Sequence, residues 1–192
     1  GADACVFLQH LCAGDVDVPV GKLIYTQLLN HRGGIEADIT VDRLAADRYM
    51  IVSSAATHSR DLAWIERHLV SADRVVVTDV TSAYAVLSVQ GPRSRDLLAS
   101  ISDADLSNAA FPFLTSQEIS IGYAPAIAKR VTFVGELGWE LYIPSEFAQG
   151  AFDTLTEAGQ EFGLRPAGYH ALEHLRCERA YREFGLDLAP DD

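Results

Sequence analysis

The sequence predicts an α+β fold whose sheets are mainly antiparallel. Strand-like runs come in pairs around glycine-containing turns, once around Arg32-Gly33-Gly34 and again between Gly135 and Gly138. Glycine supplies the positive φ angle that a tight reversal needs, so each pair of runs is expected to form a hairpin. Helical stripes separate these strand pairs, whereas in parallel sheets single strands alternate with helices. Two successive groups of strands, each followed by a helix, suggest two similar halves.

Composition indicates a globular domain with little affinity for polyanions. Of 192 residues, 48% are apolar, which is enough for one core or two small ones. Asp and Glu number 27 against 15 Lys and Arg, a formal net charge of −12, and no basic cluster is visible. Nucleic acid and anionic membranes are therefore poor partners. Apolar runs such as residues 83–87 are far shorter than the roughly 20 residues of a membrane span, and no signal segment opens the chain.

The three cysteines, Cys5, Cys12 and Cys177, form an odd and sparse set without a C-x-x-C pair. They are expected to be free thiols in a reducing compartment, the cytoplasm or the mitochondrial matrix. Cys5, His10 and Cys12 lie close in sequence, but their spacing does not match a metal site, which also needs a fourth ligand. Burial on a short helix is the favoured interpretation, and no metal is expected.

The N-terminal part is expected to hold a helix over residues 2–12, a hairpin over about 21–42 and a third strand over 48–54. In the return strand of the hairpin, the side chains alternate between two faces. One face carries Ile35, Ala37, Ile39 and Val41, and the other carries Glu36, Asp38, Thr40 and Asp42. A further helix, capped by Thr57 and ending near Leu69, has an apolar stripe of Leu62, Ile65 and Leu69.

Further strands are predicted over residues 74–80 and 84–89, the second nearly all apolar and therefore central in its sheet. A helix over about 92–101, a loop over 102–112 and strands over about 113–121, 126–134 and 139–143 follow. The next helix has an apolar stripe and ends at Gly163: Phe147, Ala151, Leu155, Ala158 and Phe162. The last helix, about 168–182, is expected to turn Leu172 and Leu175 inward, with Glu173, Arg176 and Arg182 nearer solvent.

The first hairpin places a carboxylate, Asp38, on a rigid strand beside a glycine turn. On spacing alone, a solvated strand face is the more common explanation. The run GGIEAD followed by a β-branched pair, however, resembles the folate-binding domains of the glycine cleavage T-protein (aminomethyltransferase) family. It more closely resembles the C-terminal domain of sarcosine and dimethylglycine dehydrogenases. The resemblance implies a T-protein-like fold and makes Asp38 the catalytic residue of one-carbon transfer to tetrahydrofolate.

A second stretch, TFVGELGWELYIP over residues 132–144, extends the resemblance. Strand alternation puts Glu140 and Tyr142 on its polar face, so an exposed glutamate on an amphipathic strand remains an alternative. In the T-protein family the matching glutamate hydrogen-bonds the pterin, which implies folate binding by Glu140 through two parallel bonds to its carboxylate. Phe133 stands where many members have a tyrosine, so the ring contact is retained without the hydroxyl.

Weaker matches complete the expected folate pocket. Tyr25 matches an aromatic position of the first hairpin, although a core role fits equally well, and Ser54 stands where some members have asparagine. The run over 168–188 matches the family's L-R-x-E motif, but the arginine that T-proteins carry near the folate falls on Leu172. His170 is the nearest side chain able to become cationic. It can replace that arginine only if the helix begins after His170.

The resemblance covers residues 1–192 as one folate-binding aminomethyltransferase-like domain, a fragment of a longer protein that also has a flavin domain and a further C-terminal domain. It implies a one-carbon transfer module of an FAD-dependent, sarcosine dehydrogenase-like enzyme, which forms methylene-tetrahydrofolate from the N-methyl-derived imine. The expected partners are tetrahydrofolate, that imine and the protein's own flavin domain. FAD is expected only in the missing N-terminal part, because no G-x-G-x-x-G loop occurs here.

Three alternatives remain open. The chain could be a non-catalytic folate-binding module with a regulatory or assembly role, a stand-alone aminomethyltransferase, or a hydrolase that uses Asp38 and Glu140 as paired carboxylates. The hydrolase predicts a cleft rich in exposed aromatic rings, which a chain with two tryptophans does not suggest. Retention of Asp38 favours transfer over a purely regulatory role. A dinucleotide-binding fingerprint upstream in the complete reading frame would favour the dehydrogenase.

Overall fold

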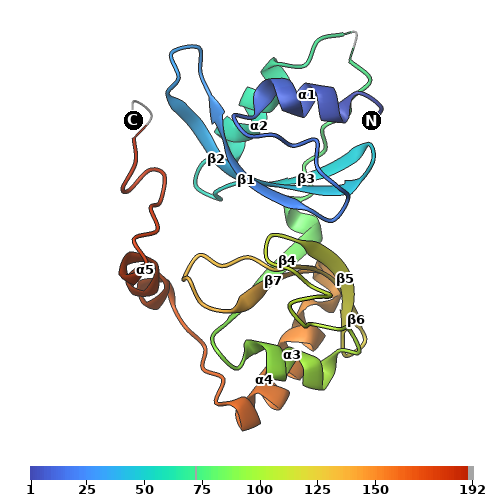
Figure 1. The fold of residues 1–192 in the computed structure, drawn as a ribbon, viewed down its shortest axis with the longest axis vertical. Helices are drawn as coiled ribbons and strands as arrows, with labels where there is room; N and C mark the ends of the chain where they lie inside the picture. Colours follow the sequence, from blue (N-terminus) through green and yellow to red (C-terminus); the bar gives the residue numbers. More distant parts are fainter. Residues whose placement is uncertain (72, 190–192) are drawn as a thin grey trace. The chain divides into compact units, whose positions relative to one another are not determined.

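The computed structural model describes residues 1–71 and 73–189, in which the chain divides into two units (Figure 1). The first unit consists of residues 1–79 together with the C-terminal segment from Arg182, and the second unit consists of residues 80–181. Each unit has its own antiparallel sheet and its own apolar core. The predicted α+β class with antiparallel sheets is confirmed, and so are the two groups of strands and helices.

In the first unit, three strands form a sheet of order β1-β2-β3, and two helices pack on its apolar face. Three of the four side chains of β2 predicted on its apolar face, Ala37, Ile39 and Val41, are buried, and they meet Phe7 of the first helix and Ile65 of the second. The predicted hairpin and third strand are therefore confirmed. The elements are α1 (Ala4–Leu11), β1 (Leu23–Leu29), β2 (Ile35–Ala45), β3 (Arg48–Val52) and α2 (His58–Arg67).

The turn between β1 and β2 is fixed by a side chain as well as by glycine. Asn30 Oδ1 accepts hydrogen bonds from the backbone N–H groups of Arg32 (2.9 Å) and Gly34 (3.1 Å). Gly33 has a φ of +86°, a left-handed conformation that glycine adopts at no steric cost. The Asn30 cap and Gly33 together fix the turn, and the pairing of β1 with β2 then shifts by one residue between Leu28 and Leu29.

The second unit contains a four-stranded antiparallel sheet of order β4-β7-β6-β5. The core gathers around β7, whose Trp139, Leu141 and Ile143 are fully buried together with Phe111 of the preceding loop. Helix α4 covers this core and ends at Gly163, which has a φ of +72°, as its sequence predicts. The elements are β4 (Tyr84–Gln90), α3 (Ser94–Ile101), β5 (Ser116–Ile121), β6 (Ala124–Lys129), β7 (Gly138–Pro144), α4 (Ala148–Phe162) and α5 (Tyr169–Glu178), with short 3-10 helices at Thr81–Ala83 and Ser145–Phe147.

Two strand predictions are wrong. Residues 74–80 form no strand, because β3 pairs only with β2 and the segment finds no neighbouring strand; Val75 and Val77 instead pack directly on the first core, while Val76 is 82% exposed. The apolar strand β4 lies at the edge of its sheet and is not central. Only one face of β4 packs on the core, so Val86 on the opposite face remains 49% exposed.

The predicted orientation of side chains is also wrong on one strand and on one helix. Asp42, expected on a solvated face, is fully buried, because it lies in the central strand β2 between Leu23 of β1 and Met50 of β3. On α5, Arg176 is buried and Leu175 is 39% exposed, the reverse of the expected orientation. The Arg176 guanidinium can be buried because Glu173 neutralises its charge at 2.6 Å and the carbonyl oxygen of Tyr181 accepts a further hydrogen bond.

The described residues contain free cysteines but no metal-ligand cluster and no helix able to span a membrane. Cys5, Cys12 and Cys177 are free thiols, and burial raises the pKa of Cys12 to about 11. Within residues 1–71 and 73–189, no group of three or more His, Cys, Asp or Glu side chains is placed to hold a metal ion. In the same part of the chain, every helix is too short or too polar to cross a bilayer.

Candidate functional site

Asp38 lies on β2 with its carboxylate held by two side chains of β1. The Tyr25 hydroxyl donates to Oδ2 at 2.8 Å, and the Gln27 amide donates to Oδ1 at 2.9 Å. Gln27 is directly opposite Asp38 in the strand register, and Tyr25 lies two residues before it, on the same face of β1. The structure therefore brings together two residues expected from sequence, Asp38 and Tyr25, and adds Gln27, which sequence reasoning missed.

The Tyr25 phenol is a protonated donor over the physiological range. Partial burial, together with the hydrogen bond to Asp38 and its negative charge, raises the pKa of Tyr25 to about 12. Each carboxylate oxygen of Asp38 has two lone pairs and accepts one of these hydrogen bonds. The half-buried carboxylate thus keeps a free acceptor position on each oxygen.

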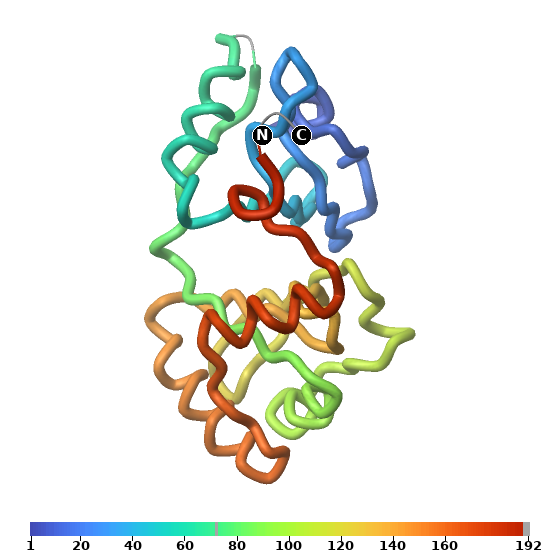
Figure 2. The backbone as a smooth tube through the Cα atoms, turned by 90° about the vertical axis from the view of Figure 1, so that its left-hand side faces the viewer, coloured from blue at the N-terminus to red at the C-terminus, as the bar shows by residue number. Residues whose placement is uncertain are grey.

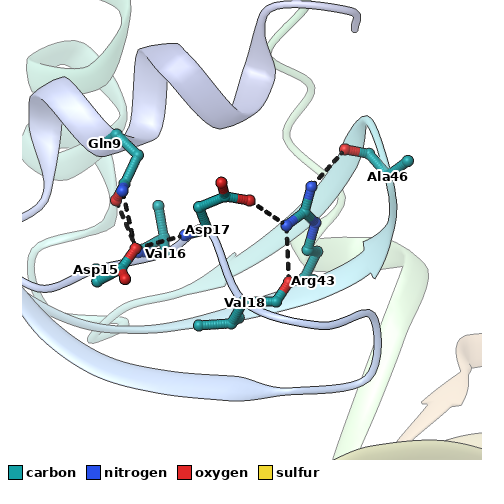
Figure 3. Close-up of polar contacts among 7 residues, drawn as sticks. All are labelled: Gln9, Asp15, Val16, Asp17, Val18, Arg43 and Ala46. Atoms are coloured by element: carbon teal, nitrogen blue, oxygen red, sulfur yellow. Dashed lines mark hydrogen bonds and ion pairs between the residues drawn. The ribbon is translucent and has the colours of Figure 1, made fainter.

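The hairpin that carries Asp38 is braced at its far end by Arg43 of β2 (Figure 3). The Arg43 guanidinium donates to Asp17 Oδ1 (2.6 Å), to the carbonyl oxygen of Val18 (2.7 Å) and to that of Ala46 (3.1 Å). The hydrogen bond from Arg43, together with the positive charge of its guanidinium, lowers the pKa of Asp17. Figure 3 also shows Asp15 bonded to Gln9 of α1, so the connector before β1 is tied both to the helix and to the sheet.

Glu140 lies on β7, on the face opposite the buried Trp139 and Leu141. The hydroxyl of Tyr142 donates to Glu140 Oε2 at 2.8 Å. Among the residues that the structure describes, Oε1 has no hydrogen-bond partner. The buried ammonium of Lys129, which is opposite Glu140 in the β6–β7 register, lies 4.2 Å from the centroid of the Tyr142 ring.

Phe133 lies in the segment between β6 and β7, where α5 contacts it. The guanidinium of Arg176 lies over the Phe133 ring at 5.8 Å from the centroid, and Arg179 forms an ion pair with Glu136 at 2.8 Å. Gly135 permits this approach, because a Cβ at that position would lie 2.4 Å from Cγ of Arg179. The glycine-rich segment is therefore held by helix α5.

The remaining predicted site residues have other surroundings. Ser54 is exposed in the turn before α2, where its hydroxyl accepts from the backbone N–H of Ala56 and its carbonyl oxygen accepts from Thr57. His170 is exposed, and α5 already begins at Tyr169, so the condition under which His170 could take the place of an arginine at Leu172 is not met. The structure thus describes one set of candidate residues in each unit, Asp38 with Tyr25 in the first and Glu140 with Phe133 in the second.

Comparison with known proteins identifies relatives that have different assigned activities. A 4-methylaminobutanoate oxidase (formaldehyde-forming) of Paenarthrobacter nicotinovorans is 41% identical over 192 residues, which are 100% of this chain and 23% of that protein. Mitochondrial sarcosine dehydrogenase of Mus musculus is 38% identical, covering 100% of this chain and 22% of its own length. The mitochondrial pyruvate dehydrogenase phosphatase regulatory subunit of Mus musculus is 37% identical, and the match covers 98% of this chain and 22% of that protein. The chain thus spans less than a quarter of the length of these relatives.

A solved structure and a family model agree with this similarity. The crystal structure of glycine cleavage system aminomethyltransferase T from Bartonella henselae superposes with a TM-score of 0.83 at 27% identity, covering 100% of this chain and 50% of that one. The fold is therefore that of the T-protein, and the resemblance deduced from the two hairpins is confirmed. A model described as the GCVT N-terminal domain matches residues 1–192. Because this match includes every residue, the chain belongs to the GCVT N-terminal domain family.

Proposed function

We propose that this chain binds tetrahydrofolate and acts as the one-carbon transfer module of a larger, flavin-dependent demethylase similar to sarcosine dehydrogenase. The family and the sequence similarity to sarcosine dehydrogenase support this assignment. In the proposed reaction an N-methyl group is oxidised to an imine in another part of the enzyme. The one-carbon unit is then transferred to folate, which gives methylene-tetrahydrofolate and the demethylated amine.

The observation that carries the proposal is the arrangement around Asp38. Both carboxylate oxygens of Asp38 are bonded, one to Tyr25 and the other to Gln27, whereas Glu36 on the same strand accepts a single side-chain hydrogen bond, from Asn30. Both donors come from the adjacent strand of the same hairpin, so the carboxylate orientation is fixed by regular secondary structure. Such preorganisation is what a group needs if it is to accept a proton or to stabilise a developing positive charge.

The surroundings of Glu140 fit the pterin ring of folate. The amino-pyrimidinone edge of a pterin presents parallel N–H donors, and a carboxylate can accept two such bonds at once. Tyr142 holds Oε2 of Glu140 in place, while Oε1 has no protein partner among the described residues. Phe133 would add a ring contact in the same unit. When bound, folate supplies the nitrogen nucleophiles that accept the one-carbon unit.

In this proposal the residues of the chain position and stabilise the reacting groups. Asp38 serves as the base, or as the negative charge that stabilises the cation formed near the reacting nitrogen. Tyr25 and Gln27 hold its two oxygens without carrying charge themselves. Glu140 fixes the orientation of the pterin, and the flavin is assigned to a part of the enzyme outside this chain.

The substitution Asp38→Asn tests the proposal in the intact protein, because it keeps the shape of the side chain and removes its charge. We expect the rate of methylene-tetrahydrofolate formation to fall by ~10²–10⁴-fold, the usual effect of losing a general base. Calorimetry should give a nearly unchanged dissociation constant for tetrahydrofolate. Glu36→Gln on the same strand is the matched control, and it should change neither quantity. An unchanged rate in the Asp38→Asn variant would remove Asp38 from the chemistry.

A second candidate function is that of a regulatory folate-binding module without catalysis. It is favoured by the 37% identity to a phosphatase regulatory subunit. This candidate predicts that tetrahydrofolate binds and that no one-carbon unit is transferred by the intact protein. A stand-alone aminomethyltransferase is the third candidate, supported by the T-protein structure, and it predicts transfer from an aminomethyl donor without any flavin. Measuring transfer from each donor separates the three.

A further inference from the structure

Two arginines from different elements of the second unit meet beside Trp139. Arg95 belongs to α3, and Arg130 directly follows β6. Their guanidinium carbons lie 5.8 Å and 5.6 Å from the centroid of the Trp139 ring. Both side chains also donate to one atom, Asn108 Oδ1, Arg95 at 2.6 Å and Arg130 at 2.8 Å. Two like charges thus converge on a single uncharged oxygen.

The other partners of the two arginines are uncharged as well. Arg95 Nε donates to the carbonyl oxygen of Leu106 at 2.9 Å, and Arg130 donates to that of Phe111 at 2.5 Å. Two guanidinium groups carry about ten N–H bonds. Four of them donate to protein oxygens here. The remaining six have no acceptor among the residues that the structure describes.

No carboxylate neutralises this pair. Within residues 1–71 and 73–189, neither Arg95 nor Arg130 has an Asp or Glu oxygen within ion-pair distance, although the chain has an excess of acidic residues. Arg43, Arg74 and Arg179, in contrast, each contact a carboxylate at 2.6–2.8 Å. Burial and the charge of Arg95 lower the pKa of Arg130. Repulsion within the pair is therefore opposed only by neutral acceptors, and a bound negative charge would relieve it.

We propose that the guanidinium groups of Arg95 and Arg130, which Asn108 holds close together, form a binding site for a small oxyanion, a phosphate or a carboxylate. The planar fork of each guanidinium matches the paired oxygens of such anions, and the unused N–H bonds provide the donors. The site lies in the second unit and uses none of the residues assigned to folate, so this inference goes beyond the proposed function. A structural role, in which the arginines only fix the loop over residues 106–111, is the competing explanation.

The substitution Asn108→Asp distinguishes the two explanations in the intact protein. It places a carboxylate at the atom that both guanidiniums already contact, so the chain would supply its own anion. We expect millimolar sodium phosphate to raise the melting temperature of the wild type by several degrees relative to sodium chloride at equal ionic strength. The Asn108→Asp variant should melt higher without phosphate and should lose the phosphate-dependent rise.

Two controls separate this effect from general charge effects. Asn108→Ser removes the shared acceptor without adding charge and should keep the phosphate-dependent rise. Ser120→Asp adds the same charge at an exposed position of β5 and should keep it too. A parallel titration with sodium acetate identifies a carboxylate ligand if acetate, and not phosphate, gives the saturable rise. Equal responses to phosphate, acetate and chloride, or a full phosphate response in Asn108→Asp, would overturn the proposal.

Discussion

At the scale of single residues, the role of each side chain in the candidate site depends on the residue that lies opposite it on the neighbouring strand. Asp38 could be singled out from the motif GGIEAD, but Gln27 could not, because its role depends on the register that places it opposite Asp38. The same holds for Lys129, which is buried opposite Glu140. A residue count from the turn, where the backbone N–H of Asn30 donates to the carbonyl oxygen of Gly34, would have placed Thr26 opposite Asp38, because the pairing shifts by one residue between Leu28 and Leu29. Glutamine and lysine are otherwise too common on strand surfaces to attract notice.

Tyr25 reports directly on the charge of Asp38. Partial burial and the hydrogen bond to Asp38 raise the pKa of Tyr25 to about 12, so Asp38→Asn should lower it, while the burial that remains should keep it above the ordinary value of about 10. Absorbance titration of the tyrosines measures the change, and Tyr25→Phe identifies which transition belongs to Tyr25. Because the folded state holds this proton longer than the unfolded state, Tyr25 should reduce stability as the pH rises from about 10 to about 12. Identical titrations in wild type and Asp38→Asn would mean that the bond does not form in solution.

Glu140→Gln tests the second set of site residues. If both oxygens accept from the pterin, the loss of charge should weaken tetrahydrofolate binding by roughly 1.5–3 kcal/mol, the usual contribution of charge-assisted hydrogen bonds. Calorimetry measures this difference. Glu118→Gln, at an exposed position of β5 in the same sheet, is the control and should leave affinity unchanged. Equal affinities for wild type and Glu140→Gln would favour an ordinary surface glutamate.

At the scale of elements, the sequence predicted those structures whose signals are local. Both hairpins have glycine at the turn, and α4 has a regular stripe with a glycine at its end, so these elements could be predicted, although β6 ends at Lys129, five residues before its predicted end. Residues 74–80 have equally good strand composition, but whether a strand forms depends on finding a partner, which is a tertiary property. The edge position of β4 has the same cause. The buried face of α5 was missed because burial of Arg176 depends on Glu173 and on the carbonyl oxygen of Tyr181.

Two glycines in the second unit should respond oppositely to alanine. Gly135 has a φ of +71°, and a Cβ there would lie 2.4 Å from Cγ of Arg179, so Gly135→Ala should destabilise the protein by about 1–2 kcal/mol through backbone strain alone. Gly150 lies inside α4 with open space around a Cβ, and Gly150→Ala should stabilise it by up to about 1 kcal/mol. Chemical denaturation measures both changes. A neutral Gly135→Ala would show that the segment before β7 does not need the left-handed conformation.

At the scale of the whole molecule, the chain leaves the first unit, forms the second and returns. Figure 2 traces this path, which ends with the segment after α5. The segment from Arg182 belongs to the first unit although more than 100 residues separate it from residue 79. In it, Phe184 and Leu188 form an isolated β-bridge, and the guanidinium of Arg60 in α2 lies 5.6 Å from the centroid of the Phe184 ring. The first unit is therefore completed only after the second has been synthesised.

This path predicts that a substitution near the C-terminus destabilises α2. Phe184→Ala removes a half-buried ring and its cation–π contact with Arg60, which together should cost about 1–2 kcal/mol in the first unit. Leu186, in the same segment, is 65% exposed, so Leu186→Ala is the matched control and should change little. Amide hydrogen exchange measured by mass spectrometry should show faster exchange over residues 58–67 in Phe184→Ala, with residues 148–162 of α4 unchanged. Faster exchange in α4, or none in α2, would show that the returning segment does not stabilise the first unit.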